Sequence, residues 1–304
     1  MTCSRREFLR MGAATAFCGP ALLKDGALHA QTLKLPLAIQ LYSVRDLLSN
    51  DFAGTLKALA SLGFREVEAA GYYDHSAEEV RKALDDAGLK LVSAHYSFDD
   101  LRKQFDQIVA FNHALGVGTL ICSTPGFKEP SRLDGIPPGA RNRPYTLDDW
   151  QWNADQFNQF GEKMHAASMK FGYHNHSMEF QTIDGVVPYA ELLRLTDPAK
   201  VTMEMDCGWV VVGGGDPVEY LTKYPTRISM LHVKDFKRPD PASGRRGGRA
   251  AELGQGYIDY RPIFAAAAKA GQVTHCFVEQ EGFDMAPMES LRIDANYMHN
   301  LGIG

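Results

Sequence analysis

Short apolar runs alternate with longer amphipathic segments along the chain from about residue 33 onward. The longer segments carry apolar residues at three- and four-residue spacing, which is the period of a helix with one buried face. One of them opens with Ser76 and Glu79 at capping-box spacing and stops at Gly88, as a single helix would. The short runs, each of strand length, cover residues 35–42, 64–71, 89–96, 118–126, 169–176, 200–206, 227–235 and 274–281.

Eight strand–helix units in succession predict an α/β fold, a single-domain (β/α)8 TIM barrel over residues 33–304. No G-x-G-x-x-G segment opens the series, so a doubly wound dinucleotide-binding sheet is disfavoured. No linker divides the units between two domains.

The first 30 residues have the features of an export signal rather than of the fold. The segment SRREFLRMGAATAFCGPALL pairs Arg5 and Arg6 with an Ala-rich apolar stretch, and it resembles a twin-arginine signal peptide. The stretch is too short and too small-sided to serve as a membrane anchor. A small-residue cleavage site follows at Ala30, so we expect a periplasmic protein.

The remainder of the chain is acidic. Without residues 1–30, 28 Lys and Arg face 35 Asp and Glu, a formal charge of −7, which argues against a nucleic-acid partner. Cys122, Cys207 and Cys276 lie in apolar runs. These surroundings favour small buried core residues over a disulfide or a catalytic thiol.

Titratable residues gather where the predicted strands end. In a barrel these ends meet at one mouth, and catalytic side chains come from several of them. Charged residues are rarely buried unless they are paired or bound, so a shared metal ion explains the pattern better than packing does. The residues concerned are Glu68, His95, His174, His176, Glu179, Glu204, Asp206, His232, Lys234, Asp235, Glu279 and Glu281.

Strand geometry narrows the choice of metal ligands. Successive strand residues face opposite sides, so His174 shares a face with His176, and Glu204 shares one with Asp206. One or two histidines with two carboxylates suit one divalent ion such as Mn²⁺, Mg²⁺, Co²⁺ or Zn²⁺, with positions left for substrate oxygens. The sequence thus predicts a metal site at the mouth without fixing the metal.

Two connections, 124–146 and 236–259, are too long for plain turns. Both are rich in Gly, Pro and Arg, and both leave the ends of strands where barrel enzymes build their sites. We expect them to cover bound substrate, with a surface insertion as the alternative. Arg249, in the second connection, is assigned a substrate contact, because its planar fork binds polar groups; a solvated basic loop is the alternative.

Six segments in order resemble the xylose-isomerase-like TIM-barrel superfamily. This superfamily includes sugar phosphate isomerases and epimerases, ketose 3-epimerases, inosose dehydratases and endonuclease-IV-type enzymes. The segments extend over essentially the whole chain after residue 30 and read GLKLVSAH, YHNHSMEF, MEMDCGWVVVGGGDP, LHVKD, ELGQGYIDY and FVEQE.

The resemblance implies one metal held by a residue from each of strands five to eight. Where the epimerases have a glutamate on strand five, this chain has His174, with His176 and Glu179 as alternative ligands. Inosose dehydratase-like relatives also have a histidine-rich fifth strand, so elimination is as credible as epimerisation. The implied ligands are His174, Asp206, His232 and Glu279.

The resemblance also implies an enzyme that moves a proton next to a sugar carbonyl through an enediolate. Glu279, with Glu179 or His174, is the expected acid–base group. Lys234 either neutralises a developing oxyanion or pairs with Asp235. Contacts with the carbohydrate substrate are expected from Glu68, His95, His176 and Trp209.

The expected outcome is isomerisation, epimerisation or loss of a β-substituent, such as the aglycone of a 3-keto-glycoside. Export favours the last, because sugar phosphates are mostly cytoplasmic. Two other classes stay open. An abasic-site endonuclease would need several metals and a basic groove, which the charge opposes. A non-catalytic sugar-binding protein would use Trp209, which either stacks on a sugar or packs, but would have no use for the metal ligands.

Overall fold

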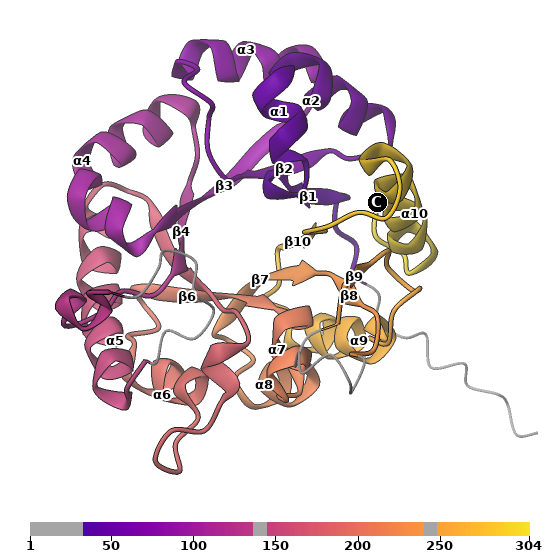
Figure 1. Ribbon diagram of the computed structural model, residues 1–304. Coiled ribbons are helices and arrows are strands. Elements are labelled where there is room, and N and C mark those ends of the chain that lie inside the picture. Colours follow the sequence, from indigo (N-terminus) through magenta and orange to yellow (C-terminus); the bar gives the residue numbers. More distant parts are fainter. Residues whose placement is uncertain (1–32, 136–144, 240–247) are drawn as a thin grey trace, which may run out of the picture. The chain divides into compact units, whose positions relative to one another are not determined.

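Eight parallel strands close into a barrel with helices packed around it (Figure 1). The computed structural model describes residues 33–135, 145–239 and 248–304. The strand order around the barrel is β1-β10-β7-β6-β5-β4-β3-β2, so the predicted TIM barrel is confirmed. Its strands are β1 (Ala38–Gln40), β2 (Glu66–Ala69), β3 (Lys90–Ser97), β4 (Thr119–Thr124), β5 (Lys170–His174), β6 (Val201–Asp206), β7 (Ile228–Val233) and β10 (His275–Val278).

At least one helix follows every barrel strand along the chain, and local capping signals set several of the helix starts. The predicted capping box is present: Glu79 N–H donates to Ser76 Oγ at 3.3 Å, and Ser76 N–H donates to the Glu79 carboxylate at 2.8 Å. The helices are α1 (Arg45–Asn50), α2 (Phe52–Ser61), α3 (Ala77–Ala87), α4 (Phe98–Leu115), α5 (Leu147–Ala166), α6 (Pro188–Leu195), α7 (Cys207–Gly213), α8 (Pro217–Lys223), α9 (Tyr260–Ala270) and α10 (Pro287–Asn300), with 3-10 turns η1 (Leu41–Val44), η2 (Pro130–Leu133) and η3 (Met178–Phe180).

The connection after β7 contains a small antiparallel ribbon of β8 (Asp235–Phe236) and β9 (Ala250–Ala251). The Asp235 carboxylate organises the connection, because it accepts hydrogen bonds from the backbone N–H groups of Gly254, Gly256 and Ile258 at 2.9–3.1 Å. This loop therefore has a structure of its own beside the barrel mouth.

The barrel interior is layered, with an apolar layer below the polar strand ends. Gly172 lies beside this apolar layer, and a larger residue would not fit there, because a Cβ would come within 2.6 Å of Ile121 Cδ1. The residues two positions after Ala38, Ile121, Met230 and Phe277 are polar, and they continue the same inward face toward the mouth, as strand alternation requires. The apolar layer consists of Ala38, Ile121, Met230 and Phe277, with Val92 packed against them.

Residues 31–304 form one compact unit, and its two ends meet. Gly304 N–H donates to Leu35 O at 2.9 Å, next to the pairing of β1 with β10. None of the described helices combines the length and the apolar character needed to cross a membrane. The predicted export signal, residues 1–30, lies outside the described residues, as do 136–144 and 240–247 of the two long connections.

The three cysteines after residue 30 are buried free thiols, as the sequence predicts. Burial raises the pKa of the Cys122 and Cys276 thiols beyond the physiological pH range. Burial raises the pKa of the Cys207 thiol as well. These thiols are core residues.

Candidate active site

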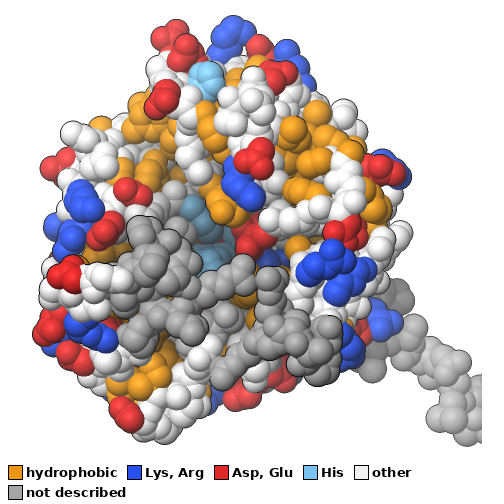
Figure 2. Space-filling model, viewed as in Figure 1, with side chains coloured by type: hydrophobic (Ala, Val, Ile, Leu, Met, Phe, Trp, Pro, Cys, Tyr) orange, Lys and Arg blue, Asp and Glu red, His pale blue; other side chains and the backbone are white. Residues whose placement is uncertain are grey.

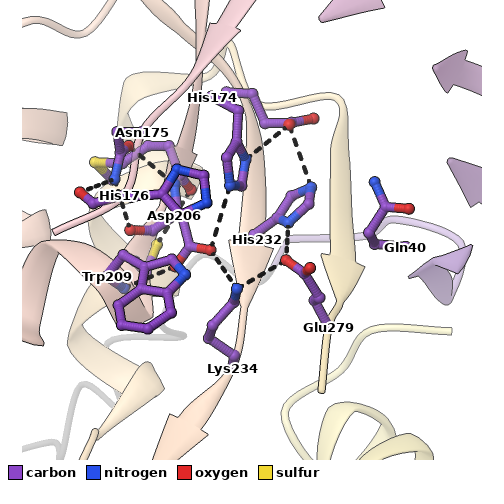
Figure 3. Close-up of polar contacts among 12 residues, drawn as sticks. Gln40, His174, Asn175, His176, Asp206, Trp209, His232, Lys234 and Glu279 are labelled. Atoms are coloured by element: carbon purple, nitrogen blue, oxygen red, sulfur yellow. Dashed lines mark hydrogen bonds and ion pairs between the residues drawn. The ribbon is translucent and has the colours of Figure 1, made fainter. Parts of the chain in front are cut away.

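Four side chains from β5, β6, β7 and the end of β10 point toward one another at the barrel mouth (Figure 3). One ligand atom from each lies within 4.8 Å of those of the others, and all four residues are buried. Atoms that bind one ion at about 2.0–2.3 Å can be at most about 4.6 Å apart, so little movement would complete a site. The four residues are His174, Asp206, His232 and Glu279.

The local structure around Asp206 fixes the direction of its carboxylate. Asp206 ends β6 and caps α7, because its Oδ1 accepts a hydrogen bond from Trp209 N–H at 2.7 Å. The amide of Asn175 accepts from Asp206 N–H at 3.1 Å and so joins the ends of β5 and β6. Oδ2 is thereby turned to the mouth, 2.8 Å from Lys234 Nζ and 3.7 Å from His174 Nε2.

Glu204 lies at the centre of a second group of possible ligands with His95, His174 and His232. Its Oε2 is 2.6 Å from His95 Nε2, 3.0 Å from His174 Nδ1 and 3.2 Å from His232 Nε2. Its Oε1 is buried without a hydrogen-bond partner among the described residues. No individual role was predicted for Glu204, although strand alternation placed it on the same face as Asp206.

Glu68 supports the histidines from below. It is fully buried, and it accepts hydrogen bonds from Gln40 Nε2 at 2.8 Å and from Ser93 Oγ at 2.5 Å. Its Oε1 lies 2.8 Å from His232 Nε2 and 2.9 Å from His95 Nε2. A carboxylate in this position orients the two imidazoles and cannot reach a sugar hydroxyl, so the expected substrate contact of Glu68 is not supported.

The negative charge of the buried carboxylates exceeds the permanent positive charge of the side chains around them. Burial disfavours the charged form of His95, but the carboxylates of Glu68 and Glu204 outweigh it and raise its pKa to about 9. Burial also disfavours the charged form of His232, but the nearby carboxylates, chiefly Glu204, raise its pKa well above the usual value. The site thus attracts protons, and a divalent cation could replace their charge. Glu68, Glu204, Asp206 and Glu279 are the carboxylates concerned, beside Lys234.

Lys234 joins three carboxylates. Its Nζ lies 2.8 Å from Asp206 Oδ2, 2.8 Å from Glu279 Oε2 and 2.6 Å from Glu281 Oε1. Burial opposes the charged form of this lysine, but these acids keep its pKa well above the usual value. The expected alternative, a pair with Asp235, is not formed, since that carboxylate accepts backbone N–H groups instead.

A cavity of about 850 Å³ opens above the cluster. Figure 2 shows histidine side chains at the bottom of a hollow, with acidic side chains beside them. One face of α4, formed by Asp100, Gln104 and Ile108, makes part of its wall. The floor is lined by His95, His174, His176, Glu279 and Glu281. The cluster is therefore open to a small molecule from the mouth of the barrel.

The model of the xylose isomerase-like TIM barrel family matches residues 56–301. The chain belongs to this family. An inosose dehydratase from Clostridium botulinum (strain Alaska E43) is 28% identical over 251 residues, covering 76% of this chain and 83% of the relative. One from Lacticaseibacillus casei is 26% identical over 250 residues, covering 76% and 82%.

Solved structures show the same fold. A sugar phosphate isomerase/epimerase from Parabacteroides distasonis aligns with a TM-score of 0.69 and 26% identity, covering 89% of this chain and 95% of that chain. An IolI protein with a bound zinc atom aligns with a TM-score of 0.68, covering 88% and 98%, and at 12% identity this likeness concerns the fold alone.

Besides Glu68, two of the substrate contacts expected in this xylose isomerase-like barrel do not line the cavity. Trp209 packs on Phe236, with ring centroids 5.0 Å apart, and donates its indole N–H to Glu281 at 3.1 Å. Of its two expected roles, packing is the one the geometry supports. Arg249 is exposed and forms an ion pair with Asp284 at 3.0 Å.

Glu179 lies behind strand β5, away from the ligands. Its Oε1 accepts hydrogen bonds from Tyr173 OH at 2.5 Å and from His176 N–H at 3.1 Å. Tyr173 faces the helices, where its ring stacks on Phe157 at 4.7 Å. Burial raises the pKa of Glu179 to about 7. It holds the loop after β5 and is not placed to act as a ligand or to exchange a proton with substrate.

The two histidines of the YHNH segment differ in their surroundings. His174 is one of the four candidate ligands. Burial together with the charges of His232 and His95 lowers its pKa well below the usual value. His176 lines the cavity, and its Nδ1 is buried without a hydrogen-bond partner among the described residues. Burial and Lys234 lower the pKa of His176 to about 4. Both imidazoles are therefore neutral, and neutral imidazole is the form that binds metals.

Proposed function

We propose that the chain is a divalent-metal-dependent lyase of the dehydratase type, acting on a cyclic keto-sugar or a 3-keto-glycoside. One observation carries the proposal: four ligand atoms of two histidines and two carboxylates lie within 4.8 Å of one another under an open cavity. The family membership and the similarity to proteins named inosose dehydratase support elimination ahead of isomerisation. The signal-like residues 1–30 support a periplasmic location.

The donor set fits one divalent cation. Histidine nitrogens with carboxylate oxygens suit Zn²⁺, Co²⁺ or Mn²⁺, and buried carboxylates in excess of cationic side chains call for a compensating charge. When bound, the ion supplies Lewis acidity that stabilises negative charge on a carbonyl oxygen of the substrate. The residues that would hold it are His174, Asp206, His232 and Glu279.

Glu279 is the residue that we assign to proton abstraction. It lines the cavity, and its Oε2 is held by His232 Nδ1 at 2.7 Å and by Lys234 Nζ at 2.8 Å. Its Oε1 makes no hydrogen bond to another described residue and is free to accept the proton next to the carbonyl. Burial would raise the pKa of Glu279, but Lys234 and His232 hold it well below the usual value, so the group is an ionised base.

His95 is placed to complete the elimination. A C–H bond next to the carbonyl breaks, its electron pair forms a carbon–carbon double bond, and the bond to the β-oxygen breaks. That oxygen takes up a proton and leaves as water or as an alcohol, so no oxidant or reductant is needed. His95 lines the cavity and has a pKa of about 9, so it carries a proton to donate at neutral pH.

Isomerisation or epimerisation is the second candidate, because it begins with the same proton abstraction. The similarity to a sugar phosphate isomerase/epimerase, at 26% identity, favours it. The two reactions differ in the next step: an epimerase returns a proton to carbon, whereas a lyase loses the β-substituent.

Proton exchange tests both candidates. The purified protein, supplied with divalent metal, is incubated with keto-sugars and 3-keto-glycosides in deuterated water, and NMR follows deuterium at the α-carbon. We expect exchange together with an unsaturated ketone as product. Glu279→Gln should reduce both by about 10²–10⁴-fold, as loss of a general base does, while circular dichroism stays unchanged.

Glu219→Gln, which alters an exposed carboxylate on α8, is the matched control and should keep full activity. Exchange that survives Glu279→Gln would remove Glu279 from its assigned role. An epimer or isomer without any unsaturated product would establish the second candidate in place of the lyase.

A further inference from the structure

A second, smaller hollow adjoins the main cavity. It has a volume of about 250 Å³, and it lies between the connection that follows β1 and the connection that follows β10. Glu281 lines both hollows. Tyr42 lines the main cavity, while Ser43, the next residue along the chain, lines the smaller one. One short stretch of chain therefore forms a wall of both spaces.

The combined space exceeds the needs of one sugar ring. Pockets for drug-sized ligands measure about 300–1,000 Å³, and the main cavity alone, at about 850 Å³, lies in the upper part of this range. A single six-membered ring is smaller than such ligands. A substrate that consisted only of the reacting ring would leave most of the space unfilled.

The wall between the two hollows presents a fixed aromatic ring. Tyr42 is 43% exposed, although it is a large apolar side chain. The Arg45 guanidinium lies 4.3 Å from the centre of its ring and donates to Tyr42 O at 2.9 Å, which holds this segment in place. Asp46 adds an acceptor, while Phe283 and Pro287 add apolar surface. Such a lining suits a ring with an apolar face and a polar edge.

Glu281 marks the boundary between the hollows and is fixed there. Its Oε1 lies 2.6 Å from Lys234 Nζ and 3.1 Å from Trp209 Nε1, and its side chain is 34% exposed. A carboxylate held by two donors and still exposed is positioned to accept a hydrogen bond from a hydroxyl beside the bond that joins two rings.

We propose that the smaller hollow is a second subsite, which takes a ring-shaped group attached to the reacting sugar, either a second sugar ring or an aryl aglycone. This inference rests on the proposed function, in which the reacting ring lies over His174 and Glu279. It narrows the substrate class from keto-sugars in general to glycosides of ring-bearing alcohols. Tyr42 and Arg45 are then residues of specificity rather than of chemistry.

Binding of unreactive ligands tests the subsite without turnover. Methyl glucoside, phenyl glucoside and a glucose disaccharide, none of them oxidised, are titrated into the metal-supplied protein by calorimetry. We expect one or both ring-bearing ligands to bind at least about tenfold more tightly than methyl glucoside, a difference of about 1.4 kcal/mol. Comparing the two separates an aryl preference from a sugar preference.

Tyr42→Ala should remove most of this preference while methyl glucoside affinity stays within about twofold, and Arg45→Ala should reduce it in the same direction. Both side chains lie at the surface, so neither variant should lose the fold, which circular dichroism checks. Met285→Ala is the matched control, because Met285 is 38% exposed in the connection after β10 and lines neither hollow.

Equal affinity for the three ligands, no binding at millimolar concentration, or a preference that survives both variants would overturn the subsite. A preference that the variants abolish, in a protein that exchanges no proton of any keto-sugar, would keep the subsite and reject the proposed lyase.

Discussion

Asp206 joins backbone structure to the chemistry of the mouth. One oxygen caps α7 and the other faces Lys234 and His174. A substitution at Asp206 therefore changes two properties at once. Loss of the cap costs about 1 kcal/mol of stability, and loss of the other oxygen removes a candidate ligand. Effects of Asp206 variants on activity have to be compared with their effects on the free energy of unfolding.

Asp294 is a buried acid that the proposed chemistry does not use. It accepts a hydrogen bond from Leu253 N–H at 2.7 Å, and its Oδ2 has no partner among the described residues. Burial raises its pKa to about 7. Because the folded pKa exceeds the unfolded one, the folded state holds this proton more firmly, and the resulting stability is lost as pH rises through about 7.

Asp294→Asn should therefore make the free energy of unfolding less sensitive to pH. Relative to the parent, we expect the variant to gain on the order of 1–3 kcal/mol between pH 5 and pH 8, measured by urea unfolding at both values. Glu289→Gln, an exposed change on the same helix, should show no such gain. A variant that loses stability relative to the parent as pH rises would contradict the buried-acid explanation.

At the scale of single residues, strand alternation predicted which residues of one strand share a face, such as Glu204 with Asp206. The set of four ligands came from the family resemblance, and the structure brings these four residues together. Alternation carries no information about depth, however. The sequence could not tell that Glu68 lies beneath the histidines, out of reach of a substrate.

Helix α7 begins directly at the end of β6, and Gly208 makes this junction possible. A Cβ at Gly208 would lie 2.4 Å from Lys234 Cγ and 3.0 Å from Lys234 O. The side chain of Lys234 passes through the space that glycine leaves. Helix start and lysine position are thus set by the same residue.

Gly208→Ala should displace Lys234 from its three carboxylates or push α7 outward. We expect a loss of about 1–3 kcal/mol in the free energy of unfolding, as overpacking usually causes, together with reduced proton exchange. Gly118→Ala is the matched control, because a Cβ there meets nothing within 4 Å. If Gly208→Ala behaved like the control, the close approach of Gly208 to Lys234 would not be needed for stability or for proton exchange.

At the scale of elements, the sequence located every barrel strand but not the structure of the longer connections. Apolar runs and caps such as Ser76 are local signals, and they survive in the fold. The ribbon of β8 and β9 depends instead on Asp235 receiving backbone N–H groups from residues about 20 positions later. A contact of that kind leaves no periodic pattern, so the ribbon was not predicted.

At the scale of the whole molecule, charge at the mouth couples cation binding to stability. Glu68, Glu204, Asp206 and Glu279 repel one another at the centre of the barrel, and only the folded chain brings them together. A cation that binds there stabilises the folded state by mass action, by about 2.7 kcal/mol at a concentration 100 times its Kd.

Chelation should therefore lower the Tm of the purified protein by about 5–10 °C, and one equivalent of a suitable divalent ion per chain should restore it. Calorimetric titration and metal analysis measure the stoichiometry. His174→Ala should abolish the shift, whereas His113→Ala, an exposed change near the end of α4, should preserve it. A Tm that no divalent ion raises would count against the metal site and favour a sugar-binding protein.

Trp209, Arg249 and Glu179 mark the limit of prediction at this scale. Trp209 and Glu179 closely follow strand ends in sequence and Arg249 lies in the long connection after β7, which made a substrate or catalytic role reasonable. In the structure they contact Phe236, Asp284 and Tyr173, partners that come from other parts of the fold. Proximity along the chain could not reveal these tertiary partners, and the direction of each side chain depends on them.

The two ends of the barrel meet, because Gly304 N–H donates a hydrogen bond to Leu35 O. The same barrel could therefore be formed by a chain that begins and ends elsewhere. The barrel without residues 1–32 is therefore suited to circular permutation, with a short linker across this junction and new ends in the exposed turn at Pro198 and Ala199. That turn precedes β6 and so lies at the end of the barrel opposite the cavity. In such a chain β6 would be made first and the strand of His174 last, so that His174 would change from the first to the last of the four candidate ligands to be made.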